Sequence, residues 1–151
     1  MKPPQKRQFT VIITTVFWKQ NKHHKYGVLL HTLKVVYHVV QKRLYRMIPA
    51  AFLHDISKPF VAYQKPEDIP VHEYSFTDHE EESYRMVRNL RGIGKYTKDL
   101  VRYHYLLRDM SKCLKRHQID RYAEKKRIWD NLPANFQQDL RRFQKCDDAA
   151  K

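Results

Sequence analysis

The chain has 151 residues, of which 42% are hydrophobic and 13% aromatic, so it is too apolar to be disordered and long enough to bury a core without disulfides. Lys and Arg number 30 against 16 Asp and Glu, and the resulting formal net charge of +14 favours anionic partners such as nucleotides or nucleic acid. Only three glycines are present, which argues against sandwiches and small barrels, because their strands need frequent tight turns.

The N-terminal part contains one short apolar run, from Phe9 to Trp18. It is too short to span a bilayer and lacks a small-residue cleavage site, so we expect no membrane segment and no export signal. Its β-branched residues fit either a strand or a buried first helix, and in either case we expect a core element. The two cysteines, Cys113 and Cys146, form no CxxC pair, which favours a reduced, cytoplasmic setting.

Helical patterns with short connections fill the rest of the chain. Residues 26–47 carry apolar side chains at spacings of three and four, which predicts a long amphipathic helix. Its apolar positions are Leu29, Leu30, Leu33, Val36, Tyr37, Val40 and Leu44. Pro49 fits the first turn of a second helix, which Pro59 then ends after Lys58. The charged, proline-containing stretch 60–75 is typical of a surface loop.

Four further helices complete the prediction. Thr77 followed by Glu80 is a capping-box pattern, which predicts a helix over 78–90 that a pair of glycines ends. Helical propensity and periodicity predict the others over 97–109, 119–132 and 136–149. We therefore predict an all-α, compact single domain of five or six helices over residues 1–151, with an N-terminal segment at 1–25 and a helical core at 26–151.

Histidines and acidic residues interrupt these apolar helical patterns. His54 and Asp55 are adjacent within AAFLHDIS, and His31 lies within GVLLHTLK. A buried imidazole beside a buried carboxylate is costly unless both are satisfied, and a metal cation satisfies both. Bundle cores are common places for such sites, because side chains from facing helices converge there. Three more candidates lie on helices with an apolar face: His79, His104 and Asp147.

The order H…HD…H…H…D, with the contexts HTLKVV, AAFLHDISKP, FTDHEEES, LVRYH and FQKCDDAAK, resembles the HD-domain superfamily of metal-dependent phosphohydrolases. The segments HDISKP, DHEEES and LVRYH are especially similar to the HD region of CCA-adding tRNA nucleotidyltransferases and to small stand-alone HD hydrolases. The resemblance implies an all-α fold. It also implies that a metal-activated water hydrolyses a phosphomonoester or phosphodiester in a nucleotide or nucleic acid.

The resemblance also implies roles for single residues. A principal metal would be held by four ligands: His31, His54, Asp55 and Asp147. Asp55 would bridge to a second metal that His79 and His104 complete. Imidazole and carboxylate ligands suit Mn or Fe, and also Ni or Co. Asp148 is an alternative to Asp147, and since neighbouring helical residues point about 100° apart, we expect only one of them to reach an ion.

Asp55 and Lys58 are the predicted catalytic residues. Lys58 is expected to hold a non-bridging phosphate oxygen, and a solvated lysine at a helix end is the alternative. The family pattern HDxGK is here HDISK, with Ser57 where glycine is usual. Basic residues interleave with tyrosines between 85 and 127, which suits phosphates and stacked bases. From this stretch Arg102 and Arg108, together with Lys58, are the predicted substrate-binding residues.

Two other functions remain open on the sequence alone. The chain could keep the helical fold as a non-catalytic nucleic-acid-binding protein, or its basic face could bind an acidic protein partner. The sequence does not separate a nucleic-acid substrate from a small nucleotide, and it identifies neither the metal nor the oligomeric state.

Overall fold

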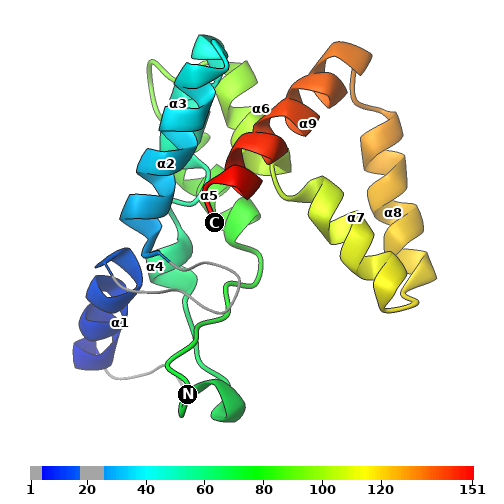
Figure 1. Cartoon of the computed structure of the whole chain (residues 1–151). Coiled ribbons are helices and arrows are strands. Elements are labelled where there is room, and N and C mark those ends of the chain that lie inside the picture. The colour runs from blue at the N-terminus through cyan, green and yellow to red at the C-terminus, as the bar shows by residue number, and fades with distance from the viewer. Residues whose placement is uncertain (1–4, 18–25) are drawn as a thin grey trace.

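The computed structural model describes residues 5–17 and 26–151, with side chains from residue 11 onward. The regular elements of the described chain are all helices, connected by turns and loops, and its only β-pairing is one isolated bridge between Tyr63 and Ser75. This confirms the all-α prediction (Figure 1). The α-helices are α1 (Gln5–Phe17), α2 (Val28–Gln41), α3 (Ile48–Leu53), α4 (Lys58–Val61), α5 (His79–Val87), α6 (Lys95–Tyr103), α7 (Leu106–Lys115), α8 (Ile119–Asp130) and α9 (Ala134–Ala149). Two 3₁₀ turns, η1 (Tyr45–Met47) and η2 (Pro66–Asp68), lie between them.

The helices form a central array with an antiparallel pair beside it. α2 packs against α3 and α9, α3 packs against α6, and α6 packs against α5. α7 and α8 run side by side and extend away from α2 and α3 (Figure 1). None of the described helices is long and apolar enough to cross a membrane.

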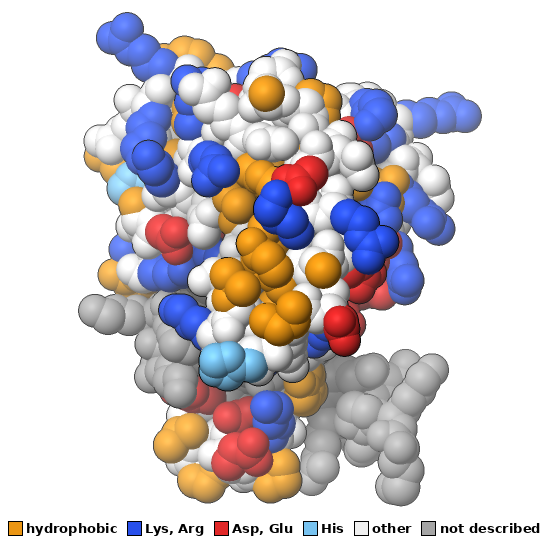
Figure 2. All heavy atoms as spheres, turned by 90° about the vertical axis from the view of Figure 1, so that its right-hand side faces the viewer, with side chains coloured by type: hydrophobic (Ala, Val, Ile, Leu, Met, Phe, Trp, Pro, Cys, Tyr) orange, Lys and Arg blue, Asp and Glu red, His pale blue; other side chains and the backbone are white. Residues whose placement is uncertain are grey.

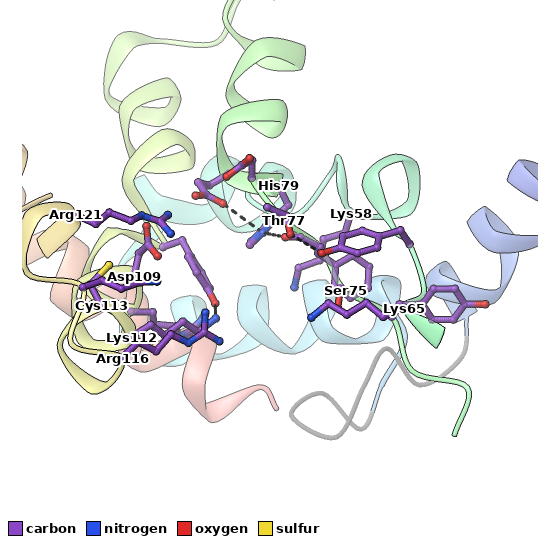
Figure 3. A pocket seen from close by; sticks show the side chains of 18 of the residues that line it. Lys58, Lys65, Ser75, Thr77, His79, Asp109, Lys112, Cys113, Arg116 and Arg121 are labelled. Carbon is purple, nitrogen blue, oxygen red and sulfur yellow. Dashed lines mark hydrogen bonds and ion pairs between the residues drawn. The ribbon is translucent and has the colours of Figure 1, made fainter. Parts of the chain in front are cut away.

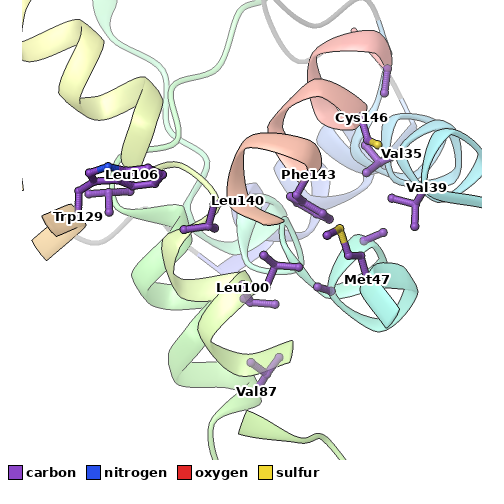
Figure 4. Packing of buried hydrophobic residues seen from close by; sticks show 14 of the residues in the cluster. Val35, Val39, Met47, Val87, Leu100, Leu106, Trp129, Leu140, Phe143 and Cys146 are labelled. Carbon is purple, nitrogen blue, oxygen red and sulfur yellow. The ribbon is translucent and has the colours of Figure 1, made fainter. Parts of the chain in front are cut away.

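The core is a cluster of aliphatic and aromatic side chains from most of these helices (Figure 4). Phe143 of α9 is fully buried and lies in the cluster with Val35, Met47 and Leu100, each 2% exposed or less. Full burial of one such side chain contributes about 1.5–3 kcal/mol, so these positions fix how α9 sits on α2 and α6. Trp129 of α8 belongs to the same cluster and joins the α7–α8 pair to it.

α2 buries a different face from the predicted one. Its buried residues are Val28, His31, Thr32, Val35 and Val39. The predicted apolar positions Leu29, Leu30, Leu33, Tyr37 and Val40 are all exposed, by 42–57%. The other two predicted positions, Val36 and Leu44, are partly buried and pack against the core cluster. Most of the predicted face was wrong because α2 is apolar on both sides, and periodicity detects an apolar face without showing which one meets the core.

Three predicted helices are shorter or interrupted. The helix predicted over 26–47 stops at Gln41, where the amides of Arg43 and Leu44 bond to the carbonyls of Val40 and Val39 at 2.9 Å. This is a Schellman motif with Arg43 in the left-handed region (φ 56°). Glycine is usual at this position, so an arginine there is no sign of a helix end in the sequence. The helices predicted over 49–58 and 97–109 break at 54–57 and at 104–105, which makes five or six helices too few.

The predicted capping box does not form. α5 begins after Asp78, which adopts a left-handed conformation (φ 56°) and makes no side-chain cap bond. Thr77 is paired elsewhere, since its hydroxyl lies 2.9 Å from that of Tyr63.

The N-terminal run forms a helix rather than a strand. α1 packs against α4 and α2 at the edge of the array, and the core cluster includes none of its described side chains, which corrects the prediction of a core element. Trp18, where the predicted run ended, lies outside the described residues. Gly27 allows α1 to approach α2 closely, because a Cβ there would lie 2.4 Å from the carbonyl oxygen of Val16.

Candidate metal centre

Five chain segments bring the six predicted ligands together. His31 lies on α2, His54 and Asp55 in the turn between α3 and α4, His79 at the first position of α5, His104 just after α6, and Asp147 on α9. All six are 4% exposed or less. Four of them therefore stand at a helix end or break. In a continuous helix His54 and Asp55 would point about 100° apart, whereas here their side chains lie 3.3 Å from one another (Nε2 to Oδ2).

Each of the four histidines is oriented by a backbone carbonyl. Nδ1 lies 3.4 Å from the oxygen of Ala150 for His31, 2.9 Å from Ala51 for His54, 2.9 Å from Phe76 for His79 and 2.6 Å from Val101 for His104. An Nδ1–H that donates to a carbonyl leaves the Nε2 lone pair to face the centre. This arrangement is typical of metal-binding histidines, whose second nitrogen is held by an outer hydrogen bond.

The ligand atoms form two groups, each within a span of 4.8 Å. One group is His31, His54 and Asp147, and the other is Asp55, His79 and His104. Asp55 joins them, because its Oδ2 lies 3.5 Å from Nε2 of His31 and its Oδ1 lies 3.5 and 3.7 Å from Nε2 of His79 and His104. A carboxylate with one oxygen toward each group has the geometry of a bridging ligand.

Without a cation, the burial of these polar groups would cost free energy. Nε2 of His54 and Oδ1 of Asp55 are buried and make no hydrogen bond to any described residue. Burial alone would raise the pKa of Asp55, but His54 and Lys58 hold it well below its usual range, so the carboxylate stays charged. Burial and the charge of Lys58 lower the pKa of His79 to about 3, so its imidazole is neutral at pH 7. A charged carboxylate beside the neutral imidazole of His79, with three further imidazoles around it, is a donor set suited to a divalent transition metal.

Lys58 is a buried residue at the edge of the centre. Its Nζ lies 2.7 Å from Oδ2 of Asp55, and its side chain is 6% exposed, so it is not a solvated helix-end lysine. Ser57, in place of the usual glycine, ties this turn to α5: its hydroxyl donates to the carbonyl of His79 at 2.6 Å and its amide donates to the hydroxyl of Ser83 at 3.2 Å. Sequence reasoning missed Ser83, and a lone serine in a helix carries no signal that would have identified it.

Asp147, not Asp148, faces the histidines. Its Oδ1 lies 2.9 Å from Nε2 of His31, and its side chain is 4% exposed, against 48% for Asp148. Arg108 holds both acids, through Nη1 on Oδ2 of Asp147 and through Nη2 on Oδ1 of Asp148 at 2.7 Å. Burial would raise the pKa of Asp147, but the close contact with His31 and the charge of Arg108 hold it well below its usual range. Of the two aspartates that the sequence offered, only Asp147 therefore lies within the cluster.

A cavity of about 560 Å³ opens on the His79 side of the centre (Figure 3). Lys58, His79 and Arg108 line it, together with basic and aromatic side chains from α7, α8 and the 63–78 segment. Arg102 does not line it. Nε of Arg102 lies 3.2 Å from Glu81 and its guanidinium stacks on Tyr84, so the structure places this predicted substrate-binding residue on the α5–α6 surface.

An all-α array that gathers four histidines and two aspartates in one buried centre, beside a basic cavity, belongs to a class of proteins built to hold metal and bind anions. The chain matches the HD domain over residues 28–135 and is therefore a member of that family of metal-dependent phosphohydrolases. The matched range includes five of the six ligand candidates, while Asp147 lies beyond it and is placed by geometry. No curated protein and no solved structure matches the chain.

Proposed function

We propose that this protein is a hydrolase that uses two metals to cleave a phosphomonoester or phosphodiester in a nucleotide or nucleic acid. The observation that carries the proposal is the convergence of four carbonyl-oriented imidazoles on the two oxygens of Asp55. His31, His54, Asp55 and Asp147 would hold the principal metal. Asp55, His79 and His104 would hold the second. The donor set favours Mn or Fe, with Ni or Co as further candidates.

Metals bound there would make a water molecule nucleophilic at neutral pH and neutralise charge on the phosphoryl oxygens. The chain's own residues supply the rest of the chemistry. Asp55 fixes the spacing of the two groups, and Arg108 keeps the Asp147 carboxylate charged and turned inward. Lys58 touches Asp55 and also lines the cavity, so its ammonium is placed to hold a phosphate oxygen next to the centre.

The cavity supports an anionic substrate. Seven of its lining residues are Lys or Arg and three are Asp or Glu, and tyrosine rings lie among them. Phosphate groups and stacked bases suit such a lining. Arg108 and Lys58 are the predicted substrate-binding residues that line this cavity, so we keep both in that role.

Substitution of Asp55 tests this function. Asp55→Ala should abolish hydrolysis of bis-p-nitrophenyl phosphate by the Mn- or Fe-loaded protein, because both metal groups lose their shared ligand. Bound metal, measured by mass spectrometry after dialysis, should fall with it. Asp130→Ala is the matched control, since Asp130 is an exposed acid on α8 that contacts only Lys126 among the described side chains. If the wild-type protein loaded with either metal hydrolyses no phosphoester in a nucleotide panel, the proposal fails and the non-catalytic binding functions replace it.

A further inference from the structure

The cavity beside the metal centre has two walls, with His79 between them. α7 and the start of α8 form one wall and contribute Lys112, Arg116 and Arg121. The 63–78 segment forms the other and contributes Lys65. Figure 3 shows these cations on opposite sides of His79. Positive charge therefore flanks the centre on two sides.

Some of these cations have no acidic partner. Lys65, Arg116 and Arg121 are exposed and form no ion pair with any side chain that the structure describes. The other basic groups of the cavity are engaged: Lys58 with Asp55, Arg108 and Lys151 with Asp148, and Lys112 with the hydroxyl of Tyr105. The unpaired charge is thus located at the two walls, two residues on the α7–α8 wall and one on the 63–78 wall, where it is available to a ligand.

Aromatic rings accompany the cations on both sides. Tyr63, which is 42% exposed, belongs to the wall that carries Lys65, and Tyr105 lies next to the centre, with its ring centroid 5.0 Å from that of His79. Stacking on such rings requires unpaired bases, because the bases of a duplex are already stacked on one another. The rings therefore favour a single strand over a duplex.

We propose that the substrate of the phosphohydrolase site proposed above is a single strand of nucleic acid that crosses the cavity from wall to wall. The scissile phosphodiester lies beside His79 and Lys58, with further phosphates on both sides of it. A mononucleotide carries its phosphates on one side of the sugar and can occupy only one wall. A strand has phosphates that can contact the unpaired cations on both walls at once. The bond that is cleaved is therefore an internal phosphodiester of the strand.

Binding is measured first, without metal, so that it does not depend on catalysis. A fluorescent twelve-residue thymidine strand is titrated into protein in EDTA at several salt concentrations. On a single strand, each phosphate neutralised by the protein contributes about 0.7 to the slope of log affinity against log salt. Lys65→Gln, Arg116→Gln and Arg121→Gln should each therefore lower the slope by about 0.7.

The control distinguishes binding in the cavity from attraction of the strand by the overall charge of the molecule. Lysines and arginines are spread over the face that includes α8, and the net charge of +14 alone attracts any polyanion (Figure 2). Arg127 is also on α8, exposed and outside every ion pair recorded for the described residues, but it does not line the cavity. Arg127→Gln removes the same charge from the same helix and should leave the slope unchanged. An equal loss in Arg127→Gln and Arg121→Gln would overturn the inference.

Hydrolysis gives the second readout. With metal bound, kcat/KM should rise at least tenfold from a dinucleotide to the twelve-residue strand, with cuts at internal bonds. Lys65→Gln and Arg121→Gln should lower the ratio of activity on the strand to activity on bis-p-nitrophenyl phosphate. DNA and RNA strands are tested in parallel, and a preference identifies which of the two is the substrate.

The outcomes distinguish this inference from the function on which it rests. No hydrolysis of bis-p-nitrophenyl phosphate or of any phosphoester in the nucleotide panel by the metal-loaded protein would remove the proposed function. Hydrolysis of that diester without any gain from strand length, or with mononucleotides as better substrates than strands, would overturn the inference alone.

Discussion

Asp147 and Asp148 are neighbours on the last turn of α9, yet only Asp147 reaches the buried histidines. Arg108 contacts both carboxylates and so holds the end of α9 against the centre. An outer contact of this kind typically affects metal affinity 10–100-fold, whereas loss of a direct ligand affects it more. The two aspartates therefore have different expected effects on metal affinity, in line with the sequence prediction of Asp147 as the ligand and Asp148 as the alternative.

Asp147→Asn should lower the affinity for Mn or Fe more than a hundredfold, because a neutral amide replaces a charged ligand. Asp148→Asn should lower it less than tenfold, because Arg108 keeps its contact with Asp147. Bound metal is measured by mass spectrometry after equilibration against graded chelator concentrations. Equal losses in the two variants would contradict the assignment of Asp147.

At the level of single residues, most of the candidate centre could be predicted from the sequence. All six predicted ligands lie together, since polar groups inside apolar helical patterns are costly and therefore conspicuous. Arg102 is different, because it belongs to a stretch where basic residues are common and spacing does not show which of them face a cavity. Ser83 carried no signal, because its role depends on the turn at Ser57.

At the level of elements, periodicity located the helices better than it located their faces and ends. α2 is apolar on two sides, so periodicity predicted a face of this helix that is mostly exposed. Arg43 takes a left-handed conformation that is usual for glycine, so the end of α2 near it was not visible in the sequence. The start of α5 was predicted within one residue, although the capping box expected there does not form. The breaks at 54–57 and 104–105 contain ligands whose placement depends on packing that only the whole fold supplies.

A matched pair of substitutions tests the corrected face of α2. Val35→Ala removes carbon from a fully buried side chain and should lower the free energy of unfolding by about 1–3 kcal/mol. Leu33→Ala removes more carbon, but from a side chain that is 48% exposed, and should change it by less than about 0.5 kcal/mol. Urea unfolding of both variants at one fixed metal concentration provides the measurement. A cost for Leu33→Ala as large as that for Val35→Ala would mean that the outer face of α2 is covered.

At the level of the whole molecule, the metal centre is also the place where the helices meet. Its ligands come from α2, from the α3–α4 turn, from α5, from the end of α6 and from α9, and Phe143 of the core packs its ring edge-on against His54 at 5.5 Å. A cation at this point would bind to segments that lie far apart in the sequence. Folding and metal binding are therefore expected to be coupled, because an unfolded chain offers no preformed site.

Removal of metal should consequently lower the thermal stability of the protein. A ligand present at a hundred times its dissociation constant stabilises the folded state by about 2.7 kcal/mol. For a chain of this length that corresponds to a shift in Tm of roughly 5–10 °C. Tm is compared in EDTA, after addition of Mn²⁺ or Fe²⁺, and after addition of Mg²⁺, which prefers oxygen ligands and should restore less. A Tm that EDTA and Mn²⁺ or Fe²⁺ leave unchanged would show that the six buried groups are stable without a metal, and the centre would then have to be explained as a polar core.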